Sequence, residues 1–294
     1  MSLDRLLITA GSYLLINAGG DKFDLGDGAT TTLAPGNFGI GHTFLAYTPT
    51  APNTNPSYPV SNLYDYRHPR RVWKSSVTGK QFITLDFGSN KALSHLLIYN
   101  CNFTQAEIVG DEVSGFVSPV YYRTRSWPVD ERVNRAKVLI ELPGTSVRYL
   151  RLIIDTAYLT SGTVPEIGAV AAFDATGYKA MDINPDFGYA YQVEEAVKQI
   201  TMEAGPQERT QLSPHLKHVS RFTFGGYSRS KEGDLFTALT KVGKAAPLIY
   251  WENSPDGGHK GDKTYLCYLS SDVEVTWHLP QHVKSNDYKM EEVV

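Results

Sequence analysis

Between residues 60 and 174 the sequence is a series of short apolar segments, each long enough for a β-strand and too short for a helix. These segments are residues 81–87, 95–99, 136–142, 148–155 and 167–173. Turn residues such as Pro143 and Gly144 separate them, and no apolar period of 3.6 residues competes. The series cannot build a helical bundle, and it predicts a sandwich of two β-sheets.

Two details of these segments make testable expectations. Gly88, Ser89 and Asn90 are turn residues, so we expect the strand over residues 81–87 to end there. In residues 148–155 the apolar side chains Tyr149, Leu152 and Ile154 do not alternate strictly, which predicts a strand covered on both faces.

Two breaks divide the chain into three parts. Residues 48–59 hold four prolines in twelve positions, which excludes helix and central strand and predicts a linker. Residues 175–179 are a second polar break. We therefore expect an N-terminal β arm or ring-completing segment (residues 1–47), a sandwich (residues 60–174) and a different β unit (residues 180–294).

The last part mixes strand patterns with one helix pattern. Residues 189–193 and 218–224 read as partners in a hairpin, and residues 246–251, 265–269, 273–277 and 290–294 as further strands. Residues 232–244 predict a helix that Gly243 would end, with Leu235, Phe236, Leu239 and Val242 on its core face. The fold class is therefore mainly β, with one helix in a C-terminal β-barrel-like domain.

Composition excludes several classes of protein. The net charge is −3, which argues against general binding of nucleic acid. No run of eighteen apolar residues is present, so we expect no membrane insertion. Two cysteines, Cys101 and Cys267, make no disulfide framework, and both lie in apolar strand patterns that predict burial.

The chain lacks the constellation of an enzyme. His215 and His218 are spaced for a metal but have no third ligand nearby, and no G-x-S-x-G or phosphate-binding glycine pattern occurs. The acidic segment 21–28 lacks the full spacing of a calcium loop, which favours an ordinary turn. Asn102 starts a glycosylation sequon that we expect to be unused. We expect no catalytic residue, no cofactor and no metal.

Aromatic residues and arginines gather in two segments that we expect to be contact loops. Tyr, Trp and Arg are enriched in protein interfaces, and the same side chains stack on sugar rings and bind their hydroxyls. A protein interface and a glycan site therefore both remain open for them. The candidate contact residues are Tyr64, Tyr66, Arg67, His68, Arg70, Tyr121, Tyr122, Arg123, Arg125 and Trp127.

The order of motifs in residues 60–174 resembles the discoidin-type, or galactose-binding-like, jelly roll. The motifs are Ser61–Asp65, Val72–Ser75 with Trp73, the F-I-T-L-D-F-G strand at 82–88, the L-L-I-Y strand at 96–99, R-Y-L-R-L at 148–152 and I-G-A-V at 167–170. The sequence departs from the family at Ala169 and Val170, where a polar or acidic residue often stands. The resemblance implies a jelly roll in which Trp73 fills the core and Arg148 lies at the rim.

The second half resembles distal-tail and minor tail proteins of tailed bacteriophages. The resemblance rests on two long strands, a helix with the sequence D-L-F-T-A-L-T-K-V-G at 234–243, P-L-I-Y-W at 247–251 and E-E-V-V at 291–294. It implies a structural protein of the virion tail tip or baseplate, made in the host cytoplasm. Its expected partners are further copies of itself and tail-tube, hub, tape-measure or fibre proteins. A carbohydrate-binding protein that attaches to a host cell surface through a host glycan is the alternative.

Overall fold

A computed structural model describes twelve parts of the chain. They are residues 38–41, 43–129, 135–181, 190–200, 208–222, 227–228, 239–240, 242–252, 264–273, 275–279, 282–285 and 288–293. The predictions for the acidic segment 21–28 and for most of the helix at 232–244 lie outside the described residues. The described chain is mainly β, as predicted.

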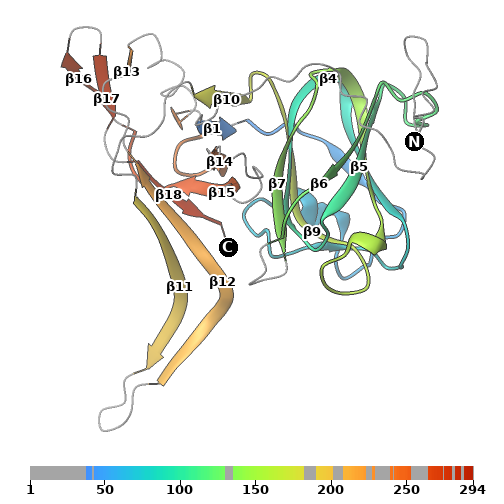
Figure 1. Cartoon of the computed structure of the whole chain (residues 1–294), viewed down its shortest axis with the longest axis horizontal. Helices are drawn as coiled ribbons and strands as arrows, with labels where there is room; N and C mark the ends of the chain where they lie inside the picture. The colour runs from blue at the N-terminus through green and yellow to red at the C-terminus, as the bar shows by residue number, and fades with distance from the viewer. Residues whose placement is uncertain are drawn as a thin grey trace, which may run out of the picture.

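The middle of the chain forms the predicted jelly-roll sandwich, on the right in Figure 1. A short 3-10 helix, η1 (Val60–Tyr64), precedes its main strands. The strands are β2 (Thr48–Thr50), β3 (Trp73–Lys74), β4 (Gln81–Cys101), β5 (Gln105–Asp111), β6 (Tyr121–Ser126), β7 (Ala136–Glu141), β8 (Ser146–Ile154) and β9 (Glu166–Asp174). The first half of β4 belongs to one sheet, together with β2, β8, β5 and β6. The second half of β4 belongs to the other sheet, together with β7, β9 and β3.

Strand β4 is a single strand of 21 residues, so the predicted end at Gly88 is wrong. Gly88 adopts a positive φ of 74°, and the register against β8 shifts between Asp86 and Lys91. Glycine allows this backbone conformation without a steric penalty, so the strand bends there instead of ending. The bend carries β4 from one sheet to the other.

The two sheets enclose one apolar core. Ile83 and Leu85 of β4 meet Leu150 and Leu152 of β8 in it, and the ring of Trp73 is buried as predicted. Strand β8 buries alternate residues from Leu150 to Ile154, so the prediction that it is covered on both faces is wrong. The strands with two buried faces are β9 and the second half of β4.

Outside the sandwich, seven strands form a separate sheet in the order β10-β1-β14-β15-β18-β12-β11. Their bounds are β1 (Phe38–Gly41), β10 (Tyr178–Met181), β11 (Ala190–Ile200), β12 (Glu208–Phe222), β14 (Leu248–Glu252), β15 (Thr264–Leu269) and β18 (Tyr288–Glu292). Strand β1 lies between β10 and β14, so the N-terminal segment completes a sheet otherwise built from the last part of the chain. The predicted hairpin of residues 189–193 and 218–224 is confirmed by the pairing of β11 with β12.

Two smaller features belong to the same part. Strands β13 (Tyr227–Ser228), β17 (His282–Ser285) and β16 (Val275–Leu279) form a three-stranded sheet. Gly243 has a φ of +59°, and its N–H donates to the carbonyl of Leu239 at 3.0 Å. This is the helix end that the sequence predicts at Gly243.

The β11–β12 hairpin extends beyond the sheet as a two-stranded ribbon (Figure 1). Strand β12 pairs with β18 only from Val219 to Phe222, while its pairing with β11 continues to Glu208. Within the described residues, the part of the ribbon before Val219 therefore has no third strand beside it. Two strands alone are of marginal stability in water.

The outer face of the β9-β4-β7 sheet packs against the seven-stranded sheet. Leu97, Leu139 and Phe173 of the sandwich share one buried cluster with Ile249 and Leu266. These contacts remove the second face of the sandwich sheet from water, which explains its continuous apolar runs.

A buried polar group crosses this interface. The Tyr99 hydroxyl donates to a carboxylate oxygen of Glu292 at 2.5 Å, and the Lys137 ammonium lies 3.1 Å from the same oxygen. The Lys137 ammonium also lies 3.9 Å from the ring centroid of Tyr265. Burial, followed by the neighbouring Glu292 carboxylate, raises the pKa of Tyr99, so its hydroxyl keeps its proton and remains a donor.

Cys101 and Cys267 are buried free thiols, as the sequence predicts. Burial raises the pKa of the Cys101 thiol to about 12, which keeps it in its unreactive form. No helix in the described residues is long and apolar enough to span a bilayer.

We expect Tyr99→Phe to lower the free energy of unfolding by about 1–3 kcal/mol, because it removes a donor from a buried carboxylate. Tyr268→Phe is the matched control, since Tyr268 packs on the same cluster and its hydroxyl makes no hydrogen bond among the described residues. It should change stability by less than about 0.5 kcal/mol. Urea denaturation measures both, and equal losses would show that the Tyr99–Glu292 bond adds nothing.

Candidate functional site

The ten predicted contact residues lie in two separate places. The first five, Tyr64, Tyr66, Arg67, His68 and Arg70, lie in residues 64–71, which begin at the last residue of η1; we call this segment the tyrosine–arginine loop. The remaining five lie on or directly after β6, an edge strand of the sandwich. The prediction that residues 121–127 form a loop is therefore wrong, because residues 121–126 pair with β5.

The β6 segment turns most of its large side chains inward. Tyr121 and Trp127 are 8% and 4% exposed, and the indole N–H of Trp127 donates to the carbonyl of Phe103 at 2.9 Å. Arg123 is 9% exposed and donates to the carbonyl of Glu141. Tyr122 and Arg125 are half-buried. Tyr121, Arg123 and Trp127 are therefore structural residues and do not present a contact surface.

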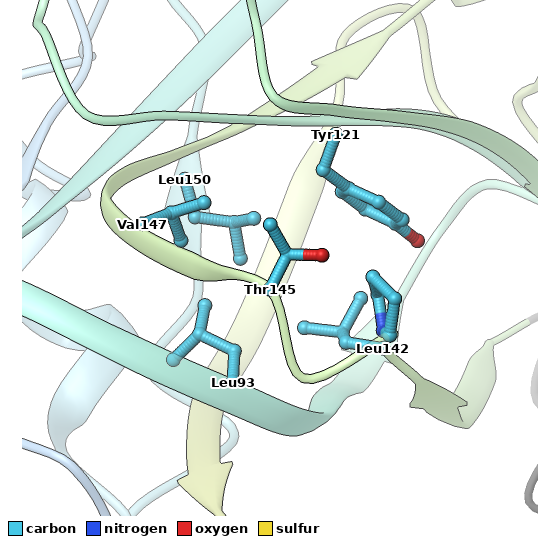
Figure 2. Close-up of a pocket in the computed structure, with 7 residues that line it drawn as sticks. Leu93, Tyr121, Leu142, Thr145, Val147 and Leu150 are labelled. Atoms are coloured by element: carbon cyan, nitrogen blue, oxygen red, sulfur yellow. The ribbon is translucent and has the colours of Figure 1, made fainter. Parts of the chain in front are cut away.

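Figure 2 shows the hollow beside Tyr121, a small apolar gap in the sandwich. Its lining residues are Leu93, Tyr121, Leu142, Pro143, Thr145, Val147 and Leu150. Ligand pockets combine apolar walls with several convergent polar groups, whereas this hollow is lined almost entirely by hydrocarbon. It is a packing defect of the core rather than a binding site.

The tyrosine–arginine loop is the exposed candidate. Tyr64 is 49% exposed, and Arg67, His68 and Arg70 are exposed beside it. The Asp65 carboxylate lies 3.1 Å from Nδ1 of His68. Tyr58, 42% exposed, lies just before η1, with the Lys74 ammonium 5.6 Å from its ring centroid.

Two half-buried tyrosines connect β9 with this loop and with the preceding η1. The Tyr66 hydroxyl donates to the carbonyl of Val170 at 3.0 Å. The Tyr47 hydroxyl lies 2.6 Å from the same carbonyl oxygen and 3.1 Å from that of Leu63. Burial raises the pKa of both tyrosines, so both hydroxyls stay protonated. These hydrogen bonds to the protein backbone fix the position of the first part of the loop.

The other end of the loop rests directly on the backbone of β9. The Asn100 side-chain amide donates to the carbonyl of Pro69 at 2.8 Å. A Cβ at Gly168 would lie 2.0 Å from that same oxygen, so only glycine permits this approach. No sequence pattern indicates Asn100 or Tyr47 as a support of this loop, and the signal at Gly168 is an isolated glycine inside a strand pattern.

The loop carries more positive than negative charge. Arg67, Arg70 and Arg71 are exposed, against the single carboxylate of Asp65. Arginine donates hydrogen bonds in a fixed planar fork, while Asp65 and His68 can also accept them. An exposed aromatic face beside such groups can hold a polyhydroxylated ring by stacking and hydrogen bonding together.

The described residues give little support for a metal site or for glycosylation. They hold no group of three or more His, Cys, Asp or Glu side chains placed to bind a metal. Asn102, the sequon residue, is 1% exposed, and its amide donates to the carbonyls of Ser161 and Val164. Its buried, fully used amide is out of reach of glycosylation.

We expect Trp127→Ala and Tyr64→Ala to differ sharply in stability. Trp127→Ala removes a buried ring and its hydrogen bond, which should cost about 3–5 kcal/mol. Tyr64→Ala removes a half-exposed ring and should cost less than about 1 kcal/mol. Thermal unfolding of both variants measures the difference, and similar losses would contradict the assignment of Tyr64 to the surface.

Comparison with known proteins finds no matching family model and no matching curated protein. Among solved structures, the chain is similar to the fucose-binding module SpX-3 of Streptococcus pneumoniae, with 14% identity over 45% of this chain and 96% of that one, and a TM-score of 0.36. The CBM32 module of AlyQ in complex with 4,5-unsaturated mannuronic acid matches with 23% identity over 46% and 98%, with a TM-score of 0.36. The family 32 module of C. perfringens NanJ in complex with galactose matches with 14% identity over 45% and 93%, with a TM-score of 0.36. None of these three is a phage tail protein.

Proposed function

We propose that this chain binds carbohydrate through the tyrosine–arginine loop. The observation that carries the proposal is the ring of Tyr64, 49% exposed on a loop that Tyr66 fastens to Val170 of β9 and Pro69 fastens to Asn100 of β4. An aromatic ring on a backbone that is already held in place can stack on a sugar ring without first being ordered.

Preorganisation supports this function. Binding a flexible loop to a ligand costs the entropy of ordering it, and a loop that is already fixed avoids much of that cost. The Tyr66–Val170 and Asn100–Pro69 hydrogen bonds and the close approach at Gly168 supply that order before any ligand arrives. Sugars bind proteins weakly, so their affinity depends on avoiding the entropy cost of ordering the loop.

The polar groups fit sugar hydroxyls and favour acidic sugars. Arg67, Arg70 and Arg71 donate only, and Asp65 accepts, so the loop can satisfy a ligand that has both kinds of group. The excess of arginine favours sugars that carry a carboxylate, which guanidinium groups bind in pairs of hydrogen bonds.

A glycan array probed with the full chain tests the proposal. We expect wild-type binding to a subset of glycans, enriched in acidic ones. Tyr64→Ala and Arg67→Ala should each weaken binding about tenfold or more, because each removes a central contact. Tyr158→Ala is the control, since Tyr158 is 41% exposed and lies in η2 (Thr156–Tyr158), on a different loop.

Two results would count against carbohydrate binding here. The first is the absence of any glycan bound by the wild-type chain. The second is glycan binding that survives both loop substitutions while Tyr158→Ala abolishes it, which would move the site to η2.

A second function, assembly with further copies of this chain, is favoured by the β11–β12 ribbon. A two-stranded ribbon is marginal alone, and its edges offer unpaired backbone groups to another strand. The ribbon leaves the sheet at Val219 and continues to Glu208 without a third strand in the described residues. A tail-tip structural role, which the sequence resemblance implies, would be one case of such assembly.

Shortening the ribbon tests this second function. Glu194 and Lys217 are register partners, so an Asn-Gly turn joining them replaces residues 195–216 with little strain. We expect the full chain to form oligomers in light scattering coupled to size exclusion, and the shortened chain to be a folded monomer. A full chain that stays monomeric up to its solubility limit would overturn self-assembly.

A further inference from the structure

The outer face of the β4-β8-β5-β6 layer carries an arginine packed on two aromatic rings. The guanidinium carbon of Arg151, on β8, lies 3.9 Å from the ring centroid of Phe116 and 4.7 Å from that of Phe82. Phe82 is 38% exposed, and Arg151 itself is half-buried. Aromatic rings stabilise a guanidinium group through its faces and leave the N–H groups at its edge to bind something else.

The other charges on this face are already paired. The Lys80 ammonium lies 2.8 Å from the Glu107 carboxylate. Arg148 binds Asp86 through two hydrogen bonds, of 2.9 and 3.1 Å. Arg151 donates from Nε to the Thr84 hydroxyl at 3.1 Å and makes no ion pair with any carboxylate in the described part of the chain.

An unpaired cation in this setting is costly. Burial lowers the pKa of Arg151, which shows that its surroundings disfavour the charge. Two aromatic contacts offset part of that cost but supply no counter-charge. The site is thus complementary to an anion.

The loop that brings Phe116 to Arg151 has a strained backbone conformation at Phe116 and carries exposed apolar side chains. Phe116 has a φ of +51°, a conformation that is costly for a bulky residue and is typical of functional positions. In the same loop, Val113, Val117 and Val120 are 57%, 89% and 40% exposed. The loop thus places the ring of Phe116 against Arg151 while its valines are exposed to solvent.

We propose that this face binds a protein segment in which a carboxylate lies next to an apolar side chain. The carboxylate accepts hydrogen bonds from the Arg151 guanidinium edge, and the apolar side chain covers Phe82 and the exposed valines. This site is separate from the tyrosine–arginine loop, so it neither requires nor supports carbohydrate binding there.

The apolar neighbours favour a peptide over an acidic sugar. The loop that carries Phe116 also carries the exposed Val113, Val117 and Val120, whose side chains offer no hydrogen bond to the hydroxyls of a uronic acid, and burying unpaired hydroxyls is costly. An aliphatic side chain gains about 0.8 kcal/mol for each methylene that it buries on the same surface.

Titration of the full chain, followed by nuclear magnetic resonance, tests the proposal with three probes. N-acetyl-L-leucine has a carboxylate beside an apolar side chain, N-acetyl-L-leucinamide lacks the carboxylate, and D-galacturonate is an acidic sugar. We expect N-acetyl-L-leucine to shift the Arg151 Nε–H signal and the ring signals of Phe82 and Phe116. The other two probes should bind about tenfold more weakly.

Three variants localise the contact. Arg151→Gln should weaken N-acetyl-L-leucine binding about tenfold. Val117→Ser should weaken it about threefold and cannot unfold the chain, since the side chain is 89% exposed. Arg148→Gln is the matched control and should leave binding unchanged, because Arg148 already pairs with Asp86.

Several outcomes would overturn the proposal. They are no shift at the three signals, equal binding of the leucinamide, galacturonate binding as tight as that of N-acetyl-L-leucine, and an equal loss in Arg148→Gln. Galacturonate binding would assign the face to acidic sugars instead. If Arg151→Gln does not fold, Val117→Ser and the leucinamide comparison still decide.

Discussion

Burial of both faces of the β9-β4-β7 sheet is the constraint on which the rest of the structure depends. One face closes the sandwich core, and the other packs against β14, β15 and β18 of the seven-stranded sheet. A sheet with two buried faces must satisfy every polar group between its layers, and the Tyr99–Glu292–Lys137 cluster does so at the second interface. The sandwich and the last part of the chain are therefore one packed structure, and the N-terminal strand β1 joins it through the seven-stranded sheet.

The bend at Gly88 decides which surfaces remain free for function. By carrying β4 from one sheet to the other, it commits the later half of the strand to the double-buried sheet. The earlier half stays in the sheet whose outer face carries Phe82 and Arg151. The tyrosine–arginine loop packs on β9 from the remaining side, through Val170 and Gly168. Two candidate binding surfaces with different chemistry thus arise from one strand that serves both sheets.

Sequence patterns located the strands better than they located the site. Apolar runs in β4, β7 and β9 predicted strands because a short continuous apolar segment bounded by turn residues is typical of a buried strand. Tyr121 and Trp127 stand beside arginines in the sequence, a pattern that predicts loop contacts. Alternation along β6 turns Tyr121 toward the core, and Trp127 packs on Phe103 directly after the strand ends. Nothing local marks which face of an edge strand is covered, because that depends on which sheet lies opposite.

The sequence by itself determined a mainly β chain, a jelly roll in its middle, the burial of Trp73 and both cysteines, and an exposed tyrosine and arginines in residues 64–71. The strands, the buried cysteines and the exposed segment follow from local periodicity and side-chain chemistry, whereas the jelly roll with Trp73 in its core is what the family resemblance implies. Only the tertiary structure decided that Gly88 bends β4, that Gly168 admits the Pro69 carbonyl, and that Arg151 lies against Phe82 and Phe116. The reason is physical: these contacts join residues far apart in the chain, and their partners are chosen by packing between sheets, which no short stretch of sequence encodes.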